Sequence, residues 1–495
     1  MKFVIIGGDA AGMSAASRAK RNNPEVEVTV FEKSYDVSYS ACGMPYNISD
    51  PSRDMDDLIV RRAEVFRQKN GINLLTGHRV DKIDPIGKTV SGTIISDTTS
   101  LFDQHSIATK QSNYTTKQKD NCNQFSYPFD KLLIATGATP LIPNIPGIDL
   151  PGVLPLKNLE HGRSIKSFIA SKSRFGGSNA SLNSVKKAVI IGMGYIGLEM
   201  CEALRARSIE VSMVKPGSQF LPWMVSELSD VVKQELIANG VKIYTGHKIE
   251  RIEQIDKIKT VDKSSLSVVC KNLASDEGLT LSADMLIVAS GVKPCSELAL
   301  DAGIKTSVSG AIAVDKTLKT SNDNIYAAGD CADSFHVVTG QKCWIPLALR
   351  ANRAGWAVAD NVCDVETLLT GVAGTALFKV FDLQVARTGL SLKEALDAGF
   401  DPAEVVVQTR SRAHAHPGSE TVHVAMAGDR KTGRLIGVQM VGKDGVAHRI
   451  NAAAVALHAN MTVADFAQTD LGYAPPFGPV WDPLLTAANQ LLKKL

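Results

Sequence analysis

The chain has 495 residues, of which 44% are hydrophobic and 21% charged, a composition typical of a globular protein of roughly two to four domains. A net charge of +3 argues against a nucleic-acid or membrane-surface partner, and no apolar run reaches the ~20 residues of a membrane span. Eight scattered cysteines without a Cys-x-x-Cys pair exclude a zinc ribbon or disulfide scaffold, and indicate reduced thiols in a cytoplasmic enzyme with no metal site.

The N-terminal residues have the pattern of a nucleotide-binding unit. The elements predicted first are a buried strand, a helix and a second strand, at residues 2–6, 13–21 and 26–31. Gly7 permits a tight turn, Gly12 lets the helix pack closely, and Glu32 follows at the spacing of an acid that binds a ribose. The helix N-terminus then faces a pyrophosphate, whose charge its free N–H groups favour. Asp9 departs from this fingerprint, because it replaces the middle glycine.

Ten residues beyond Glu32 lies a lone cysteine, Cys42, followed by Gly43 and Pro45. Cysteine is among the most buried residue types, so Cys42 by itself would favour a structural role. If the nucleotide is FAD, however, a thiol at this place could lie over the flavin ring. No second cysteine lies within five residues, so such a thiol would pair with sulfur from outside the chain.

The next stretches differ in composition. Residues 51–70 predict a helix with a solvated basic face, formed by Arg53, Arg61, Arg62, Arg67 and Lys69. From about 91 to 127 the chain is rich in polar residues, which predicts an exposed insertion between strands. Residues 130–140 predict a buried strand that ends in a glycine turn at Gly137, where backbone can approach a ligand.

A second fingerprint follows a Ser/Gly/Asn-rich loop at residues 171–184. A strand at 187–191 leads into a complete G-x-G-x-x-G, and the next strand ends at Lys215. An acid there would bind the 2′-hydroxyl of NAD, whereas a cation could pair with the 2′-phosphate of NADP. Lys215 therefore favours NADPH, with NADH possible. The alternative is a surface lysine that points away from the nucleotide.

The rest of the chain closes both units and adds a third. Residues 284–294 repeat the pattern of 130–140, so the second nucleotide unit is inserted in the first. A further apolar strand ends at Asp330, which is either a turn residue or a ligand of the FAD ribityl chain. Beyond 366, strands and helices continue without a fingerprint, and His414 and His416 receive no role. The aromatic, proline-rich end at 472–483 predicts a surface that packs on a twin subunit.

The chain resembles the single-cysteine branch of the pyridine nucleotide–disulfide oxidoreductases. The resemblance is carried by both fingerprints, Cys42, the strand that ends at Asp330 and the Tyr-Ala-Pro-Pro-Phe segment at 473–477. Within that branch the coenzyme A disulfide reductases resemble the chain most. The resemblance implies an α/β fold with two doubly wound dinucleotide-binding domains, for FAD and NAD(P)H, and a C-terminal α+β dimerisation domain in a homodimer. The expected parts are 1–150 and 291–365 for FAD, 151–290 for NAD(P)H, and 366–495 for dimerisation.

The resemblance also implies roles for individual residues, with Cys42 as the catalytic thiol. The residues expected to bind FAD are Gly7, Gly8, Gly12, Glu32, Lys33, Thr136, Gly137, Asp330 and Tyr473, the last from the partner subunit. Those expected to bind NAD(P)H are Gly192, Gly194, Gly197 and Lys215. Those expected to bind coenzyme A (CoA) are Ser14, Arg18, Arg21, Ser38 and Asn352. Ser14, Arg18 and Arg21 share one helix stripe, whose cations suit phosphates. The alternative is an ordinary basic helix face.

The implied reaction is reduction of CoA disulfide by NAD(P)H through FAD and a Cys42–S–S–CoA intermediate, which requires a lowered thiol pKa. Two alternatives are open: a CoA persulfide or polysulfide reductase, and an NADH oxidase or flavoprotein redox sensor. The family's oxidases and peroxidases carry a histidine in the first glycine loop. Ala10 occupies that place here and favours a disulfide or persulfide substrate.

Overall fold

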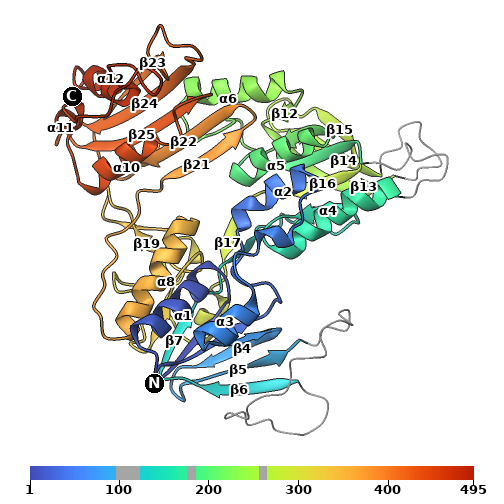
Figure 1. Ribbon diagram of the computed structural model, residues 1–495. Helices are drawn as coiled ribbons and strands as arrows, with labels where there is room; N and C mark the ends of the chain where they lie inside the picture. Colours follow the sequence, from blue (N-terminus) through green and yellow to red (C-terminus); the bar gives the residue numbers. More distant parts are fainter. Residues whose placement is uncertain (96–122, 175–184, 256–264) are drawn as a thin grey trace.

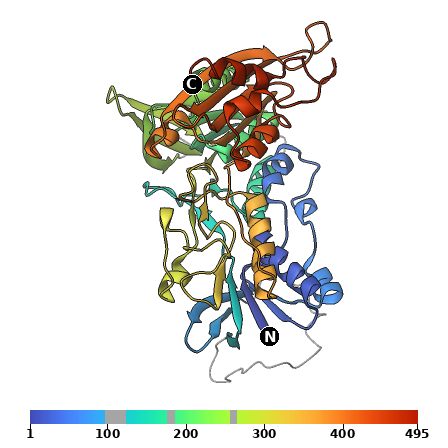
Figure 2. The same ribbon diagram turned by 90° about the vertical axis from the view of Figure 1, so that its left-hand side faces the viewer.

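The structure is a computed structural model that describes residues 1–95, 123–174, 185–255 and 265–495 (Figure 1). Three units are visible. The blue N-terminal segments and the orange helix α8 lie together, the green and the red units lie beyond them, and Figure 2 shows the same arrangement from the side. Two parallel sheets and one antiparallel sheet of five strands each confirm the predicted fold class.

The first unit is built on a parallel sheet in the order β18-β7-β1-β2-β3. Its strands are β1 (Lys2–Ile6), β2 (Glu27–Glu32), β3 (Asn73–Thr76), β7 (Lys131–Ile134) and β18 (Ile325–Ala327). Four of the five residues of β1 are buried, because parallel strands are covered on both faces. Since β18 joins this sheet after the whole second unit, the second unit is inserted in the first.

Two helices of the first unit pack side by side although they are far apart in sequence (Figure 1). They are α1 (Ala10–Asn22) and α8 (Ala348–Val362). Their backbones approach so closely that a Cβ at Gly355 would lie 2.2 Å from the carbonyl oxygen of Ala11. Next to them lie α3 (Ala63–Asn70) and an antiparallel sheet of β4 (His78–Asp84), β5 (Thr89–Ile94) and β6 (Gln124–Pro128).

The second unit repeats this plan, with a parallel sheet in the order β12-β11-β10-β16-β9. Its strands are β9 (Val153–Pro155), β10 (Lys187–Ile191), β11 (Glu210–Val214), β12 (Lys242–Tyr244) and β16 (Met285–Val288). Its helices are α4 (Leu159–Arg174), α5 (Tyr195–Ala206) and α6 (Ser226–Ala238). Antiparallel strands β13 (His247–Gln254), β14 (Leu266–Asn272) and β15 (Gly278–Ala283) complete it, and β8 (Ala138–Pro140) pairs with β17 (Val292–Pro294) where the chain passes between the units.

The third unit is an antiparallel sheet in the order β21-β22-β25-β24-β23. Its strands are β21 (Ala376–Val380), β22 (Leu383–Gly389), β23 (Pro402–Arg410), β24 (Thr421–Asp429) and β25 (Leu435–Gly442). Its helices are α9 (Leu392–Asp397), α10 (Ile450–His458), α11 (Val463–Ala467) and α12 (Pro483–Leu491). All eight residues of β25, the central strand, are buried. Among the described helices of the whole chain, none is long and apolar enough to cross a bilayer.

Three predicted segments differ from the structure. The helix predicted at 51–70 is wrong over its first half: only a 3₁₀ turn, Asp56–Leu58, precedes α3, because Ile59 pairs with Tyr39 in an extended bridge. The two ends of the predicted insertion at 91–127 belong to β5 and β6, and its centre lies outside the described residues. The predicted loop at 171–184 begins inside α4, and its remainder, 175–184, also lies outside them.

The contact between α1 and α8 yields a stability prediction. Gly355→Ala should lower the free energy of unfolding by about 1–3 kcal/mol, because the new methyl group must push the two helices apart. Gly278→Ala is the matched control, since its Cβ would meet nothing within 4 Å. Thermal unfolding followed by circular dichroism should show a lower midpoint for the first variant only. Equal unfolding midpoints for the two variants would contradict a close backbone contact between α1 and α8 at Gly355.

Candidate functional site

A cavity of about 1960 Å³ opens at the carboxyl ends of the parallel strands of the first unit, and residues of the second and third units complete its wall. Its volume exceeds the range of a pocket for one small ligand. Many residues singled out in the sequence line it: Gly7, Gly8, Ser14, Arg21, Glu32, Lys33, Ser38, Cys42, Thr136, Gly137, Asp330 and Asn352. Ligands of doubly wound sheets bind at this edge, because the carboxyl ends of the strands converge there.

The first glycine turn has the geometry of a nucleotide cradle. Gly7 has a φ of +112°, and a Cβ at Gly12 would lie 1.9 Å from the carbonyl oxygen of Gly7. The turn therefore brings β1 and the N-terminus of α1 together with no room for a side chain. At the end of β2, the Glu32 carboxylate accepts hydrogen bonds from the backbone N–H of Gly8 at 2.7 Å and of Ser34 at 2.8 Å.

Cys42 lies in an irregular segment between β2 and α2 (Met44–Ser49). It occupies a short 3₁₀ turn, Ala41–Gly43, and its side chain is exposed to the cavity. A Cβ at Gly43 would lie 2.4 Å from Cδ2 of Leu58, so a larger residue here would have to displace that side chain. Ser38 adopts a φ of +50°, and its carbonyl accepts from the N–H of Val60 at 2.9 Å, which fixes the start of the segment.

Helix α4 of the second unit holds the Cys42 segment in place. The Arg163 guanidinium bonds both carboxylate oxygens of Asp36, at 2.7 and 2.8 Å, and reaches Asp56 at 2.7 Å. One turn later, the Lys166 ammonium donates to the carbonyls of Asn47 and Asp50 at 3.0 Å, and to that of Arg53. A cation at the end of a helix stabilises its free carbonyls, and Lys166 serves α2 in this way.

The protein's own groups raise the pKa of the Cys42 thiol. Desolvation by the surrounding protein atoms, which crowd the sulfur although the residue is exposed at the cavity, is the first cause; the Glu199 carboxylate is the second, and the Lys157 ammonium opposes them. The described groups of the chain therefore do not by themselves give the lowered thiol pKa that the implied reaction requires. Glu199, on α5, accepts a hydrogen bond from the Tyr46 hydroxyl at 3.1 Å, and burial raises its pKa to about 6.

Of the three residues on α1 that were predicted to bind CoA (Ser14, Arg18 and Arg21), not all are free to bind a ligand. Ser14 donates to the amide oxygen of Asn352 at 2.6 Å, which joins α1 to the first turns of α8 at the cavity wall. Arg21 also lines the cavity. Arg18 differs, because its guanidinium lies 2.8 Å from the Asp360 carboxylate and against the Trp356 ring. Its charge is thus already neutralised by α8, which the sequence spacing does not reveal.

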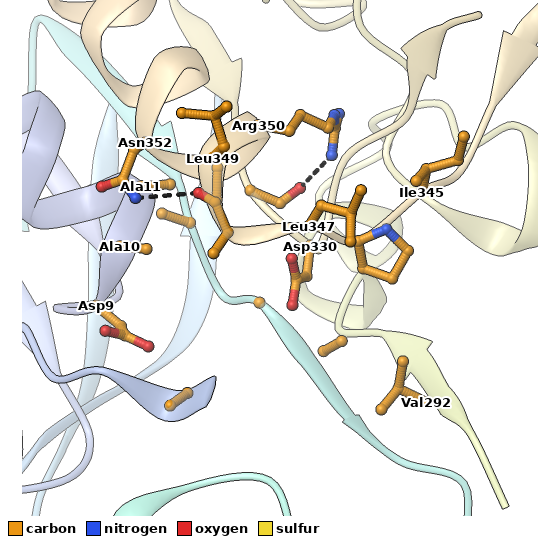
Figure 3. Close-up of a pocket in the computed structure, with 18 of the residues that line it drawn as sticks. Asp9, Ala10, Ala11, Val292, Asp330, Ile345, Leu347, Leu349, Arg350 and Asn352 are labelled. Atoms are coloured by element: carbon orange, nitrogen blue, oxygen red, sulfur yellow. Dashed lines mark hydrogen bonds between the residues drawn. The ribbon is translucent and has the colours of Figure 1, made fainter. Parts of the chain in front are cut away.

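Figure 3 shows the wall formed by the strand end of β18 and the start of α8. Asp330 points into the cavity from one side and Asp9 from the other. The Asp330 carboxylate lies 3.0 Å from the Lys157 ammonium. The guanidinium of Arg350, a buried residue, donates to the carbonyl of Gly329 at 2.9 Å and so fixes the turn before Asp330.

The second glycine turn forms a similar cradle. Gly192 has a φ of +101°, a Cβ at Gly197 would lie 2.7 Å from the carbonyl oxygen of Gly192, and the space beside Gly194 is open. Lys215 ends β11 as predicted, but its ammonium donates to the carbonyl of Phe220 at 3.2 Å, and burial lowers its pKa. Tyr473 lies in the third unit, away from this cavity, with 50% of its surface exposed.

The sequence assigned no role to several residues that lie in or beside the cavity. Lys157 and Glu199 face Cys42, Tyr46 links Glu199 to the thiol segment, and Arg61 lies at the wall over the ring of Phe66. Arg61 belongs to the stretch that had been interpreted as a solvated basic face. Only Asp9 carried a signal, because it interrupts the glycine fingerprint.

Comparison with known proteins identifies the family. The profile of the pyridine nucleotide-disulphide oxidoreductases matches residues 1–355, and the profile of their dimerisation domain matches 375–483. The chain belongs to this family.

Two relatives and one solved structure illustrate the family. The NAD(P)H sulfur oxidoreductase (CoA-dependent) of Pyrococcus abyssi is 36% identical over 489 residues, which cover 99% of this chain and 97% of that protein. An NADH oxidase of Methanocaldococcus jannaschii is 31% identical over 499 residues, covering 100% and 99%. The crystal structure of reduced Bacillus anthracis CoADR-RHD has a TM-score of 0.87 at 30% identity, covering 99% of this chain and 80% of that one.

The family uses FAD and NAD(P)H, so the chain is an FAD-dependent NAD(P)H oxidoreductase. The two glycine turns fit these nucleotides, because each leaves backbone N–H groups at a helix N-terminus with no side chain in the way. FAD, when bound, supplies the two electrons that NAD(P)H delivers. Cys42 lies at the cavity that the first turn forms.

The charges around Cys42 yield a prediction. Glu199→Gln should lower the pKa of the Cys42 thiol, because an ionised carboxylate beside it disfavours the thiolate and the amide keeps the hydrogen bond from Tyr46. The rate at which iodoacetamide alkylates Cys42 can be followed by peptide mass spectrometry from pH 7 to 10. In the variant this rate should begin to rise at a lower pH than in the wild type. Glu227→Gln, on α6 outside this cavity, should leave the profile unchanged. An unchanged profile for Glu199→Gln would contradict the assignment.

Proposed function

We propose that the enzyme reduces CoA disulfide with NAD(P)H, through a mixed disulfide between Cys42 and CoA. The observation that carries this proposal is an exposed thiol at the wall of the nucleotide cavity, with every cysteine of the described residues unpaired. Residues 1–150 and 291–365 would hold FAD, 151–290 NAD(P)H, and 366–495 the contact with a second subunit.

The steps at Cys42 follow from thiol chemistry. The thiolate attacks one sulfur of CoA disulfide, an S–S bond to Cys42 forms, and one CoA thiolate leaves. Two electrons then cleave the Cys42–S–S–CoA bond, which releases the second CoA and restores the thiolate. The Lys157 ammonium lowers the pKa of the Cys42 thiol and so favours the thiolate. Its effect opposes those of burial and of the Glu199 carboxylate, which raise this pKa.

The CoA phosphates would lie along α1. Arg21 is the cation of the predicted stripe that faces the cavity without the carboxylate partner that Arg18 has. Ser14 and Asn352, already bonded to each other, offer a hydroxyl and an amide beside it. Ser38 lies nearer to Cys42, at the positive-φ turn that starts the thiol segment. Arg61 adds a second cation at the wall.

A homodimer in the cytoplasm completes the proposal. The dimerisation profile matches the third unit, and its C-terminal segment exposes Tyr473, Phe477, Val480 and Trp481, each at 50% or more of its surface. Large apolar side chains gathered in one segment are typical of a surface that another molecule covers. The partner's Tyr473 would then reach the FAD site. Free thiols are typical of a reducing compartment.

A second candidate is reduction of CoA persulfide or polysulfide by the same thiol. It is favoured by the similarity to the Pyrococcus abyssi relative, a CoA-dependent NAD(P)H sulfur oxidoreductase. Steady-state kcat/KM for CoA disulfide and for CoA persulfide, measured on one preparation, decides between them: the larger value identifies the substrate. Oxygen reduction, as in the NADH oxidase relative, is less supported because Ala10 stands where the family's oxidases carry histidine.

Cys42→Ser tests the catalytic thiol. The variant should bind FAD and be reduced by NAD(P)H, so that the flavin absorbance bleaches, but it should lose reduction of CoA disulfide by at least about a hundredfold, since a hydroxyl cannot form the mixed disulfide. Mass spectrometry of the oxidised wild type should place CoA on Cys42.

The structure also selects the control cysteine. Cys331, which directly follows Asp330, is fully buried and its thiol donates to two backbone carbonyls. Cys295 is half-buried at the same cavity, so Cys295→Ser is the matched control and should keep its activity. Undiminished turnover by Cys42→Ser, or a CoA adduct on Cys295, would refute the assignment.

Lys215→Glu tests the cofactor preference. An acid at the end of β11 should repel the 2′-phosphate, so the KM for NADPH should rise about tenfold while NADH is unaffected or improved. Lys248→Glu, on the neighbouring strand β13, is the control for a general change of charge. Equal changes for both cofactors would mean that the Lys215 ammonium stays on the Phe220 carbonyl and does not select the nucleotide.

A further inference from the structure

Asp9 occupies the one position of the first glycine turn where this chain carries a charged side chain. It is the N-cap of α1, with φ −107° and ψ −151°, but its side chain does not cap the helix. The carboxyl group instead lies at the cavity (Figure 3), beside the turn formed by Gly7 and Gly12. A nucleotide bound to that turn therefore meets this carboxyl group.

One oxygen of this group has no partner. Oδ1 of Asp9 is buried and makes no hydrogen bond within the described ranges, and the backbone of Tyr39 acts on the carboxyl group only as a minor influence that lowers its pKa. A buried polar atom without a hydrogen bond is costly, so an unpaired one at a ligand cavity indicates that a ligand completes it.

The charges that face Asp9 are mostly negative. Glu32 approaches from the end of β2 and Asp330 from the end of β18. Lys157, before α4, is the cation in range, but it is already paired with Asp330 at 3.0 Å. The Tyr39 hydroxyl and the Cys42 thiol, both protonated at neutral pH, lie within electrostatic reach. Burial, followed by the Glu32 charge, raises the pKa of Asp9 to about 6.

A pyrophosphate at the helix N-terminus would add further negative charge to this group of carboxylates. An ionised Asp9 would then repel the ligand, whereas a protonated one has an O–H to donate. We propose that Asp9 holds FAD as a neutral carboxylic acid, so that flavin binding takes up one proton at this side chain. The inference rests on FAD as the nucleotide of the first turn.

The expected pH dependence follows from linkage. Below pH 6 Asp9 is protonated with or without flavin, so the Kd for FAD is independent of its titration. Above pH 6 the free protein loses this proton while the complex keeps it, so binding must take the proton from solvent. The Kd then rises with pH, by up to about tenfold per unit, until the pKa of the complex is passed.

The experiment uses the holoenzyme. Dilution to nanomolar concentration at pH 5.5 to 8.5, followed by the fluorescence of released FAD, gives the Kd at each pH. The wild type should release more flavin as pH rises above 6. Asp9→Asn should remove that dependence and retain flavin at pH 8, because the amide donates a hydrogen bond at every pH. Asp50→Asn, at a half-buried acid directly after α2 that does not line the cavity, should behave like the wild type.

A second measurement needs no variant. Flavin release in weak buffer with an indicator dye should set free one proton per FAD at pH 7.5. A pH-independent wild-type Kd, an Asp9→Asn profile that keeps the wild-type slope, or release without a proton would each overturn the inference while leaving FAD as the cofactor. A protein isolated without flavin would contradict the proposed function itself.

Discussion

The position of the Cys42 thiol depends on the ion pairs that Arg163 makes with Asp36 and Asp56. The segment that carries Cys42 has little regular structure of its own, so its shape must come from neighbours. Exposed ion pairs stabilise weakly one at a time, but a guanidinium that bonds both oxygens of one carboxylate and reaches a second is more specific. With Lys166 on the same face of α4, the second unit thereby holds the thiol against the cavity of the first.

Much of the fold could be predicted because its signals are local. Buried parallel strands appear as short apolar runs, and β1 and β10 are such runs, each followed by glycines with positive φ. The helix predicted over 51–70 shows the limit of this reasoning. Its first half contains a proline, a serine and three aspartates, which are weak helix formers, and the chain is extended at Ile59, which pairs with Tyr39.

The site was predictable to the extent that it follows from topology. Residues of the first glycine turn and of the strand ends around it meet at one cavity, since the carboxyl ends of parallel strands lie together, whereas the second glycine turn lies outside this cavity. Contacts between distant elements were not predictable. Arg18 is neutralised by Asp360, and Glu199 reaches the thiol segment from another unit through Tyr46. The direction of the pKa shift of Cys42 depends on such contacts, so sequence reasoning could not supply it.

The packing of α1 against α8 sets the order of events during synthesis. The N-terminal helix is made first, yet the partner that covers it, and the strand β18 that completes its sheet, come after the entire second unit. At 5–20 residues per second, a ribosome needs on the order of 20–70 s to pass from α1 to α8. Throughout that interval the face of α1 that packs on α8 has no native cover, although β1, β2 and α3 are already made, while the second unit, contiguous in sequence, can already fold. The N-terminal segment therefore cannot complete its native packing until the last third of the chain emerges.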